Sequence, residues 1–135
     1  MKVLIAEDSP LIAERLEELL SELDQVEIIG PAPDGDAAVR LFQNQRPEVA
    51  LLDLHMPGRG GLEVLIEIRK LDAGCAVAIL TNYDLPEYRD TCLRMGADFF
   101  LRKSTEFERV VEIVRDRQKT SRRETPEPVP AQTDP

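Results

Sequence analysis

The stretch LLDLHMPGRGG, residues 51–61, is an apolar run that ends in the acid Asp53 and then breaks into a segment rich in proline and glycine. Burying an ionised carboxylate costs free energy unless a cation or hydrogen-bond donors compensate for the lost water. We therefore expect the rest of the chain to supply a partner for Asp53. Gly58, Gly60 and Gly61 predict a tight turn that leads into a helix.

Apolar runs of strand type recur along the chain and are separated by stretches with helical spacing. The runs cover residues 3–6, 26–30, 49–53, 76–80 and 98–101. Several are continuously apolar, which is typical of strands that helices cover on both faces. Strands and helices in strict alternation predict an α/β fold, a doubly wound (βα)5 unit with a five-stranded parallel sheet of order 2-1-3-4-5.

Local signals predict where helices begin and end. The dipeptides typical of helix starts are Ser9-Pro10, Leu85-Pro86 and Ser104-Thr105. Gly96 is typical of the residue just past a helix end, because glycine adopts the left-handed conformation without strain. These signals agree with the five strand–helix pairs of the predicted fold.

Size and composition predict one small acidic domain. The chain has 135 residues, and we assign residues 1–118 to the domain. Residues 119–135 contain prolines without apolar periodicity, which predicts a disordered tail or the start of a linker. The formal net charge of −9 argues against nonspecific nucleic-acid binding, so we expect this chain itself to bind no nucleic acid.

The apolar runs are too short to span a bilayer, and the N-terminal stretch MKVLIAEDSP turns acidic too early for a signal peptide. We therefore expect a cytoplasmic protein that does not contact a membrane. Cys75 and Cys92 are too few and too far apart for a disulfide framework or a zinc site. They are expected to be small reduced hydrophobic residues.

Polar residues follow the strands at their carboxyl ends, which is where open parallel sheets bind ligands. They are Glu7 and Asp8 after the first strand, Asp53 at the third, Thr81 at the fourth and Lys103 after the fifth. Two unit charges about 5 Å apart repel by roughly 3 kcal/mol at an effective dielectric constant of 20. One lysine cannot offset three carboxylates, so either one acid stays protonated or a cation binds. An all-oxygen site suits Mg²⁺ or Mn²⁺.

Such a site suits the receipt of a phosphoryl group. An aspartate is an established nucleophile at phosphorus. A metal ion and Lys103 would neutralise charge on the transferring oxygens, and the Thr81 hydroxyl would donate a hydrogen bond to one of them. The residues alone therefore indicate phosphoryl chemistry at Asp53.

Four motifs at matching spacing carry a resemblance to a known family. They are LIAEDS (4–9), LLDLHMPGRGG (51–61), AILTNYD (78–84) and GADFFLRKS (96–104). Over residues 1–118 the chain resembles the receiver domain of bacterial two-component response regulators, which has a flavodoxin-like fold. The resemblance implies a signalling phosphoacceptor that assists its own phosphorylation and dephosphorylation, and not an enzyme with a separate substrate.

The resemblance also implies a role for each residue at this edge. Asp53 would accept a phosphoryl group from a histidine kinase or a histidine phosphotransfer protein. Glu7 and Asp8 would hold Mg²⁺, with Asp8 as the direct ligand, and His55 would lend its backbone carbonyl. Lys103 would be the lysine that receivers carry after the fifth strand.

In receivers, a hydroxyl and an aromatic ring carry the change from the phosphorylated site to the protein surface. Thr81 would be the switch hydroxyl and Phe100 the switch aromatic. Phosphorylation would reshape the surface of the fourth helix, fifth strand and fifth helix. If side chains alternate along the fifth strand, Phe99 is expected to be the core ring.

Two features depart from the family pattern or vary within it. The usual Lys-Pro with a cis bond is Lys103-Ser104 here, which leaves open whether this bond is cis or trans. Receivers tune the lifetime of the aspartyl phosphate through the positions of His55 and Tyr83. We hypothesise that both side chains flank Asp53 and slow the attack of water.

Partners and output stay open. By resemblance, Leu11, Ile12 and Arg15 are weak candidates for docking the histidine donor. The chain is a stand-alone receiver or the receiver part of a larger regulator, and its downstream target protein is unknown. Homodimerisation is an open alternative, with charged groups available on the fifth helix; these are Arg109, Glu112, Arg115 and Asp116.

Three other functions compete with the receiver interpretation. A Mg²⁺-dependent phosphohydrolase of the haloacid dehalogenase type also uses an aspartate nucleophile, but that class carries D-x-D after its first strand. A flavodoxin-like FMN carrier needs a phosphate loop after the first strand, where Glu7 and Asp8 would repel phosphate. A pseudo-receiver that only docks partners would not need the intact acidic set.

Overall fold

The computed structural model describes residues 1–83 and 85–124, so Asp84 of the AILTNYD stretch and residues 125–135 of the predicted tail lie outside the described part. The described strands form one parallel sheet of order β2-β1-β3-β4-β5. They are β1 (Lys2–Ala6), β2 (Glu27–Ala32), β3 (Val49–Asp53), β4 (Ala76–Thr81) and β5 (Phe99–Arg102). This order confirms the fold predicted from the alternating pattern.

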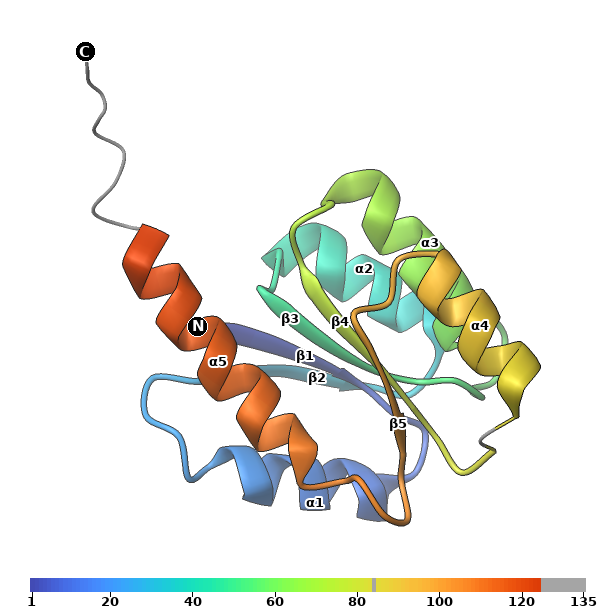
Figure 1. The fold of residues 1–135 in the computed structure, drawn as a ribbon, viewed down its shortest axis with the longest axis horizontal. Helices are drawn as coiled ribbons and strands as arrows, with labels where there is room; N and C mark the ends of the chain where they lie inside the picture. Colours follow the sequence, from blue (N-terminus) through green and yellow to red (C-terminus); the bar gives the residue numbers. More distant parts are fainter. Residues whose placement is uncertain (84, 125–135) are drawn as a thin grey trace.

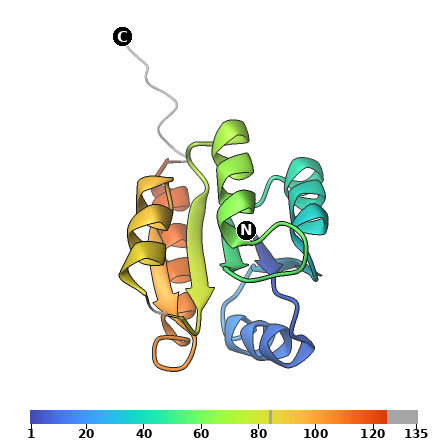
Figure 2. The same cartoon turned by 90° about the vertical axis from the view of Figure 1, so that its right-hand side faces the viewer.

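Helices cover both faces of the sheet (Figure 1). They are α1 (Pro10–Leu20), α2 (Gly35–Gln45), α3 (Gly61–Leu71), α4 (Pro86–Arg94) and α5 (Arg109–Glu124). Helices α1 and α5 lie on one face, and α2, α3 and α4 lie on the other (Figures 1 and 2). The arrowheads of β3, β4 and β5 in Figure 2 point to the same edge, as a parallel sheet requires.

The sheet separates two hydrophobic cores. In β3, Ala50 and Leu52 pack toward the side of α2 and α3, whereas Val49 and Leu51 pack toward the side of α1 and α5. Because successive side chains of a strand point to opposite faces, a strand covered on both faces has to be apolar throughout. This explains the continuous apolar runs of the sequence.

Most predicted helix starts agree with the structure. Ser9 caps α1, where its hydroxyl accepts a hydrogen bond from the Ile12 amide at 3.3 Å and Pro10 is the first helical residue. Helix α4 begins at Pro86, and Gly96 follows its end with a φ of 109°. None of the described helices is long and apolar enough to cross a bilayer.

The predicted start of the fifth helix at Ser104-Thr105 is wrong, because α5 begins at Arg109. The chain turns first: the Glu106 carboxylate accepts a hydrogen bond from the Arg102 amide at 2.9 Å, and this bond closes the turn after β5. Helix α5 then continues to Glu124, past the expected domain boundary at 118.

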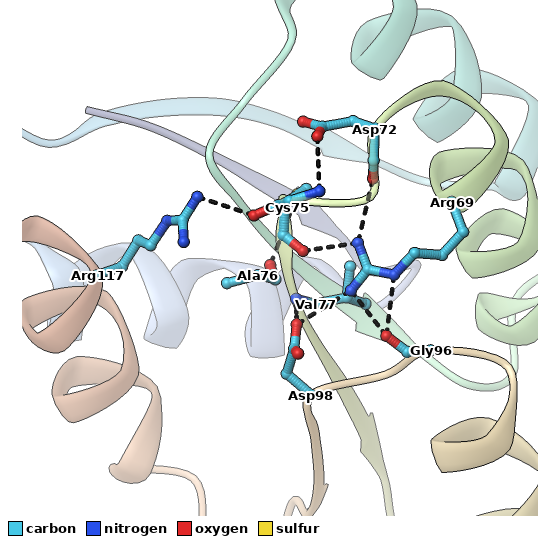
Figure 3. Close-up of polar contacts among 9 residues, drawn as sticks. Arg69, Asp72, Cys75, Ala76, Val77, Gly96, Asp98 and Arg117 are labelled. Carbon is cyan, nitrogen blue, oxygen red and sulfur yellow. Dashed lines mark hydrogen bonds and ion pairs between the residues drawn. The ribbon is translucent and has the colours of Figure 1, made fainter. Parts of the chain in front are cut away.

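Arg69 of α3 ties several segments together at the amino-terminal edge of β4 and β5 (Figure 3). Its guanidinium donates to the Gly96 carbonyl at 3.0 and 2.7 Å, to the Cys75 carbonyl at 2.7 Å and to the Asp72 carbonyl at 3.2 Å. It also pairs with the Asp98 carboxylate at 3.0 Å, whose same oxygen accepts from the Val77 amide at 2.9 Å. This Arg69 network fixes the end of α4 relative to α3 and β4.

Candidate functional site

The carboxyl-terminal edge of the sheet brings the predicted polar residues together. Glu7, Asp53 and Thr81 are 3%, 4% and 1% exposed, so the strand ends carry them out of solvent. Strands β1 and β3 are neighbours in the sheet, and the order of the strands reverses there. The Lys103 side chain reaches this point from the residue after β5, and only Asp8 of the charged residues is exposed.

Lys103 is the cation that Asp53 requires. Its ammonium nitrogen lies 3.2 Å from Asp53 Oδ1 and 2.9 Å from Glu7 Oε1. Its backbone amide donates to the Thr81 carbonyl at 2.8 Å, so the pairing of β4 with β5 sets the starting point of the side chain. In the described chain the cis peptide bond is Gly30–Pro31, and Lys103–Ser104 is trans. The trans bond therefore allows Lys103 to reach both acids.

Three carboxylates share the site with that single lysine. Glu7, Asp8 and Asp53 each offer an oxygen, and these oxygens lie within 4.8 Å of one another. The Ser9 amide donates to Glu7 Oε2 at 3.1 Å, and the His55 amide donates to Asp53 Oδ1 at 3.2 Å. Clustered carboxylate oxygens without nitrogen or sulfur donors form the ligand set that Mg²⁺ and Mn²⁺ prefer. The residues present therefore fit a divalent cation.

The pKa values reflect the excess of negative charge. Burial and the neighbouring Glu7 charge raise the pKa of Asp53 from 3.8 to about 7, although Lys103 lowers it. Burial alone would lower the pKa of Lys103, but hydrogen bonds and charge from Glu7 and Asp53 outweigh burial and raise it. The lysine thus stays charged, while Asp53 needs further positive charge to remain ionised near neutral pH.

Thr81 lies at this edge with its hydroxyl turned to its own loop. The hydroxyl oxygen accepts a hydrogen bond from the Tyr83 amide at 2.9 Å. A threonine that bonds to nearby backbone in this way is common and by itself indicates no function. The position of Thr81, buried at the end of β4 beside Asp53 at the end of β3, is what makes it a candidate.

Phe100 and Phe99 point to opposite faces of β5, as predicted, but the expectation that Phe99 is the core ring is wrong. Phe100 is 5% exposed in the core of α3 and α4, whereas Phe99 is only partly buried on the face of α1 and α5. Phe99 is the first residue of its strand, so fewer neighbours cover it. The Arg89 guanidinium of α4 lies 5.9 Å from the centre of the Phe100 ring.

A group of three aromatic rings includes the ring of His55, whose backbone amide contacts Asp53. The ring of His55 lies 5.1 Å from that of Tyr83 and 5.6 Å from that of Tyr88, in both cases edge to face. These three residues, which we call the ring cluster, line a pocket of about 360 Å³ together with Leu85. Sequence reasoning named His55 and Tyr83 but missed Tyr88. The only available signal was an aromatic residue in the first turn of an otherwise polar helix.

The weaker candidates lie outside the acidic site. Leu11 is 67% exposed, whereas the Arg15 guanidinium stacks 4.7 Å above the Phe107 ring and so packs α1 against the segment before α5. Arg109 pairs with Glu106 of its own chain at 3.2 Å. The remaining helix charges, Glu112, Arg115 and Asp116, are exposed.

Comparison with known proteins agrees with this geometry. Residues 3–115 match the family model of the response regulator receiver domain. The probable transcriptional regulatory protein NarL of Mycobacterium tuberculosis is 34% identical over 116 residues, which are 86% of this chain and 54% of that protein. The transcriptional regulatory protein DesR of Bacillus subtilis is 31% identical, over 85% of this chain and 57% of that protein. The chain thus spans about half the length of these curated relatives.

Solved structures are similar over most of the chain. The signal receiver domain of the putative response regulator NarL from Mycobacterium tuberculosis has a TM-score of 0.79 at 34% identity, over 87% of this chain and 95% of that chain. A DNA-binding response regulator of the LuxR family from Staphylococcus aureus has a TM-score of 0.78 at 31% identity, over 86% and 97% of the two chains. Together with the motifs and the acidic site, these matches establish that the chain belongs to the response-regulator receiver domain family of two-component signalling systems.

Proposed function

We propose that Asp53 is the phosphoacceptor of this receiver and takes its phosphoryl group from a histidine kinase or a histidine phosphotransfer protein. The observation that carries the proposal is the Lys103 ammonium, 3.2 Å from a nearly buried Asp53 carboxylate in a cluster of three acids. An Asp53 oxygen bonds to phosphorus as the bond from phosphorus to the donor's histidine nitrogen breaks. Lys103 keeps its positive charge beside the oxygens of the transferred group.

Glu7, Asp8 and Asp53 would hold Mg²⁺ or Mn²⁺, with Asp8 as a direct ligand and the backbone carbonyl of His55 as a further one. When bound, the ion supplies positive charge that stabilises the oxygens of the transferring group. The support for this assignment is the excess of carboxylates over cations and the all-oxygen donor set. The same groups would assist both the gain and the hydrolytic loss of the phosphoryl group.

Thr81 is proposed as the residue that responds to the phosphoryl group on Asp53. Its hydroxyl would leave the Tyr83 amide, to which it bonds at 2.9 Å, and donate to a phosphoryl oxygen instead. The β4–α4 loop would then move, and the surface of α4, β5 and α5 would change with it. Because the Phe100 ring is already buried, we propose that its contact with Arg89 changes, and that the ring does not enter from solvent.

The output is proposed to pass to a downstream target protein in the cytoplasm. The relatives are transcriptional regulatory proteins by name, and this chain spans about half of their length. We propose that the acidic receiver binds no nucleic acid itself and acts through protein contacts, either within a larger regulator or between separate chains. Self-association through α4, β5 and α5 is one form that such a contact can take.

Acetyl phosphate with Mg²⁺ tests the assignment without a cognate kinase. We expect intact-protein mass spectrometry to detect one added phosphoryl group on the wild type and none on Asp53→Asn. Asp24→Asn, which removes an exposed acid from the loop after α1, is the matched control and should be modified like the wild type. Equal labelling of Asp53→Asn would remove Asp53 from its role. Continuous release of phosphate from many small phosphate esters would favour the phosphohydrolase instead.

A further inference from the structure

Helix α4 is held differently at its two ends. Beyond its last turn, the Gly96 carbonyl accepts two hydrogen bonds from Arg69, at 3.0 and 2.7 Å (Figure 3). At its start, the capping residue Leu85 makes no side-chain hydrogen bond. Cys92 is the buried residue of the helix, and it lies near the end that Arg69 holds. The first turn of α4 is therefore held less firmly than its last.

Two adjacent side chains on this first turn contact residues on either side of β4. The Tyr88 ring lies 5.6 Å from the His55 ring, which follows β3. The Arg89 guanidinium lies 5.9 Å from the Phe100 ring of β5. Edge-to-face aromatic pairs and exposed cation–π contacts are each weak interactions. Such weak contacts can hold the first turn of α4 in place and still allow it to move.

The ring cluster is attached to the phosphoryl site through backbone hydrogen bonds. The amide of His55 donates to Asp53 Oδ1 at 3.2 Å, and the amide of Tyr83 donates to Thr81 Oγ1 at 2.9 Å. Both rings are therefore mounted on residues whose main chain touches the groups that would meet the phosphoryl group. Tyr88 is the member of the cluster that comes from a different element, α4.

We infer that Tyr88 is a positioning residue: it holds the His55 ring at the edge of the acceptor site, so that the position of α4 sets how fast Asp53 loses its phosphoryl group. The inference rests on the proposed function of Asp53 and names a regulation of that same site. In the hydrolysis step a water oxygen bonds to phosphorus as the bond to the Asp53 oxygen breaks, which yields inorganic phosphate, a proton and the free carboxylate. Without Tyr88, the His55 ring loses a support and water reaches the site more often.

A partner protein can act on this coupling by shifting the population of α4 positions. If α4 in its present position slows hydrolysis, then a protein that binds α4 in that position prolongs the signal, and one that displaces α4 shortens it. This connection runs through Tyr88 and His55 and does not require Thr81 or Phe100 to move. The receiver would thus adjust the duration of its signal to the occupancy of its α4 surface.

A double-mutant cycle on the phosphorylated protein tests the inference. The variants are His55→Ala, Tyr88→Ala and the double variant, and the measurement is the decay of the aspartyl phosphate after acetyl phosphate is removed, with Mg²⁺ present. We expect each single variant to shorten the lifetime about threefold, from the loss of one aromatic contact. The double variant should decay no faster than His55→Ala, because both changes remove the same barrier.

Two further variants serve as controls. Tyr88→Phe keeps the ring and loses only the hydroxyl, so it should decay like the wild type. Leu93→Ala removes an exposed apolar side chain from the other end of α4 and should also leave the lifetime unchanged. A general loosening of α4 would speed decay in Leu93→Ala as well, which would contradict a specific role for Tyr88.

Hydrogen exchange in the unmodified protein provides a second readout. The amides of Tyr88 and Arg89 donate to the Leu85 carbonyl at 3.0 and 3.1 Å. His55→Ala, a change outside α4, should speed exchange in the peptide that contains this first turn. Unchanged decay in Tyr88→Ala together with unchanged exchange in His55→Ala would overturn the inference. Failure of the wild type to gain a phosphoryl group would instead overturn the proposed function, so the two failures are distinguishable.

Discussion

The two edges of the sheet contain charged groups that are balanced in opposite ways. At the amino-terminal edge, the Arg69 guanidinium is fully engaged by three carbonyls and the Asp98 carboxylate. At the carboxyl-terminal edge, Lys103 faces Glu7 and Asp53, and Asp8 adds a third negative charge. The charge of Arg69 is balanced at the first edge, whereas the second has an excess of acid that an added cation or a bound proton relieves. Balanced charge at the amino-terminal edge fits a structural role, whereas unbalanced charge at the carboxyl-terminal edge marks the candidate functional site.

The largest expected effect comes from removing the Arg69 guanidinium at the amino-terminal edge. Arg69→Met should lower the free energy of unfolding by about 3 kcal/mol or more, because it leaves several partly buried carbonyls and the Asp98 carboxylate without their donor. Urea unfolding followed by circular dichroism measures the change. Arg40→Met, at an exposed position of α2, is the control and should stay within about 0.5 kcal/mol of the wild type. A loss as small as this in Arg69→Met would show that Arg69 is an ordinary surface residue.

At the carboxyl-terminal edge we expect a smaller effect on the free energy of unfolding. Here the substitution stabilises the protein. The native state raises the pKa of Asp53 from 3.8 to about 7, so the stability that this group contributes is fully present below 3.8 and is lost as pH rises through about 7. Without divalent cations, Asp53→Asn should therefore be more stable than the wild type by about 2 kcal/mol near pH 8, about half of the full three-unit shift because the native site relaxes and admits water around the charge. The difference should shrink toward pH 4.

Urea unfolding of both proteins across this pH range, in the presence of a chelator, measures the difference. Asp24→Asn is again the matched control, because it removes an exposed acid and should follow the wild type at every pH. A difference between Asp53→Asn and the wild type that stays constant with pH would show that burial of the Asp53 charge is not its cause.

The smallest expected effect is the stabilisation of the wild type by a divalent cation bound at the carboxyl-terminal edge. Mg²⁺ at ten times its dissociation constant should stabilise the wild type by about 1.4 kcal/mol through preferential binding to the native state. Differential scanning calorimetry with and without Mg²⁺ measures the shift in Tm. Asp8→Asn should reduce the shift, whereas Arg69→Met should keep it, since that change lies at the other edge. A shift that is equal in the wild type and Asp8→Asn would place the ion elsewhere.

The sequence predicted the fold and the members of the acidic site for one physical reason. Parallel strands end at a common edge, so residues that follow separate apolar runs, such as Asp53 and Lys103, have to converge once the strand order is known. The Lys103–Ser104 bond was left open because serine replaces the family's proline, and the structure has it in the trans form that non-proline residues favour. Phe99 and Phe100 could not be ranked by alternation alone, because alternation assigns faces and not depth.

Other features of the structure have no recognisable pattern in the sequence. The partners of Arg69 are mostly backbone carbonyls, which every residue carries, so the sequence does not single them out. The start of α5 at Arg109 depends on the hydrogen bond between Glu106 and the Arg102 amide, which competes with the helix signal at Ser104. Tyr88 acquires a role only because α4 places it against a ring from another loop.

The hydrogen bond from the Lys103 amide to the Thr81 carbonyl has a consequence for protein engineering. The strand, and not the loop after it, carries the ammonium to the acids. The loop of residues 104–108 can therefore accept an inserted peptide without moving the lysine, as long as Glu106 keeps its hydrogen bond to the Arg102 amide and Phe107 keeps its buried place. That loop is a suitable point at which to graft a reporter beside the proposed phosphorylation site.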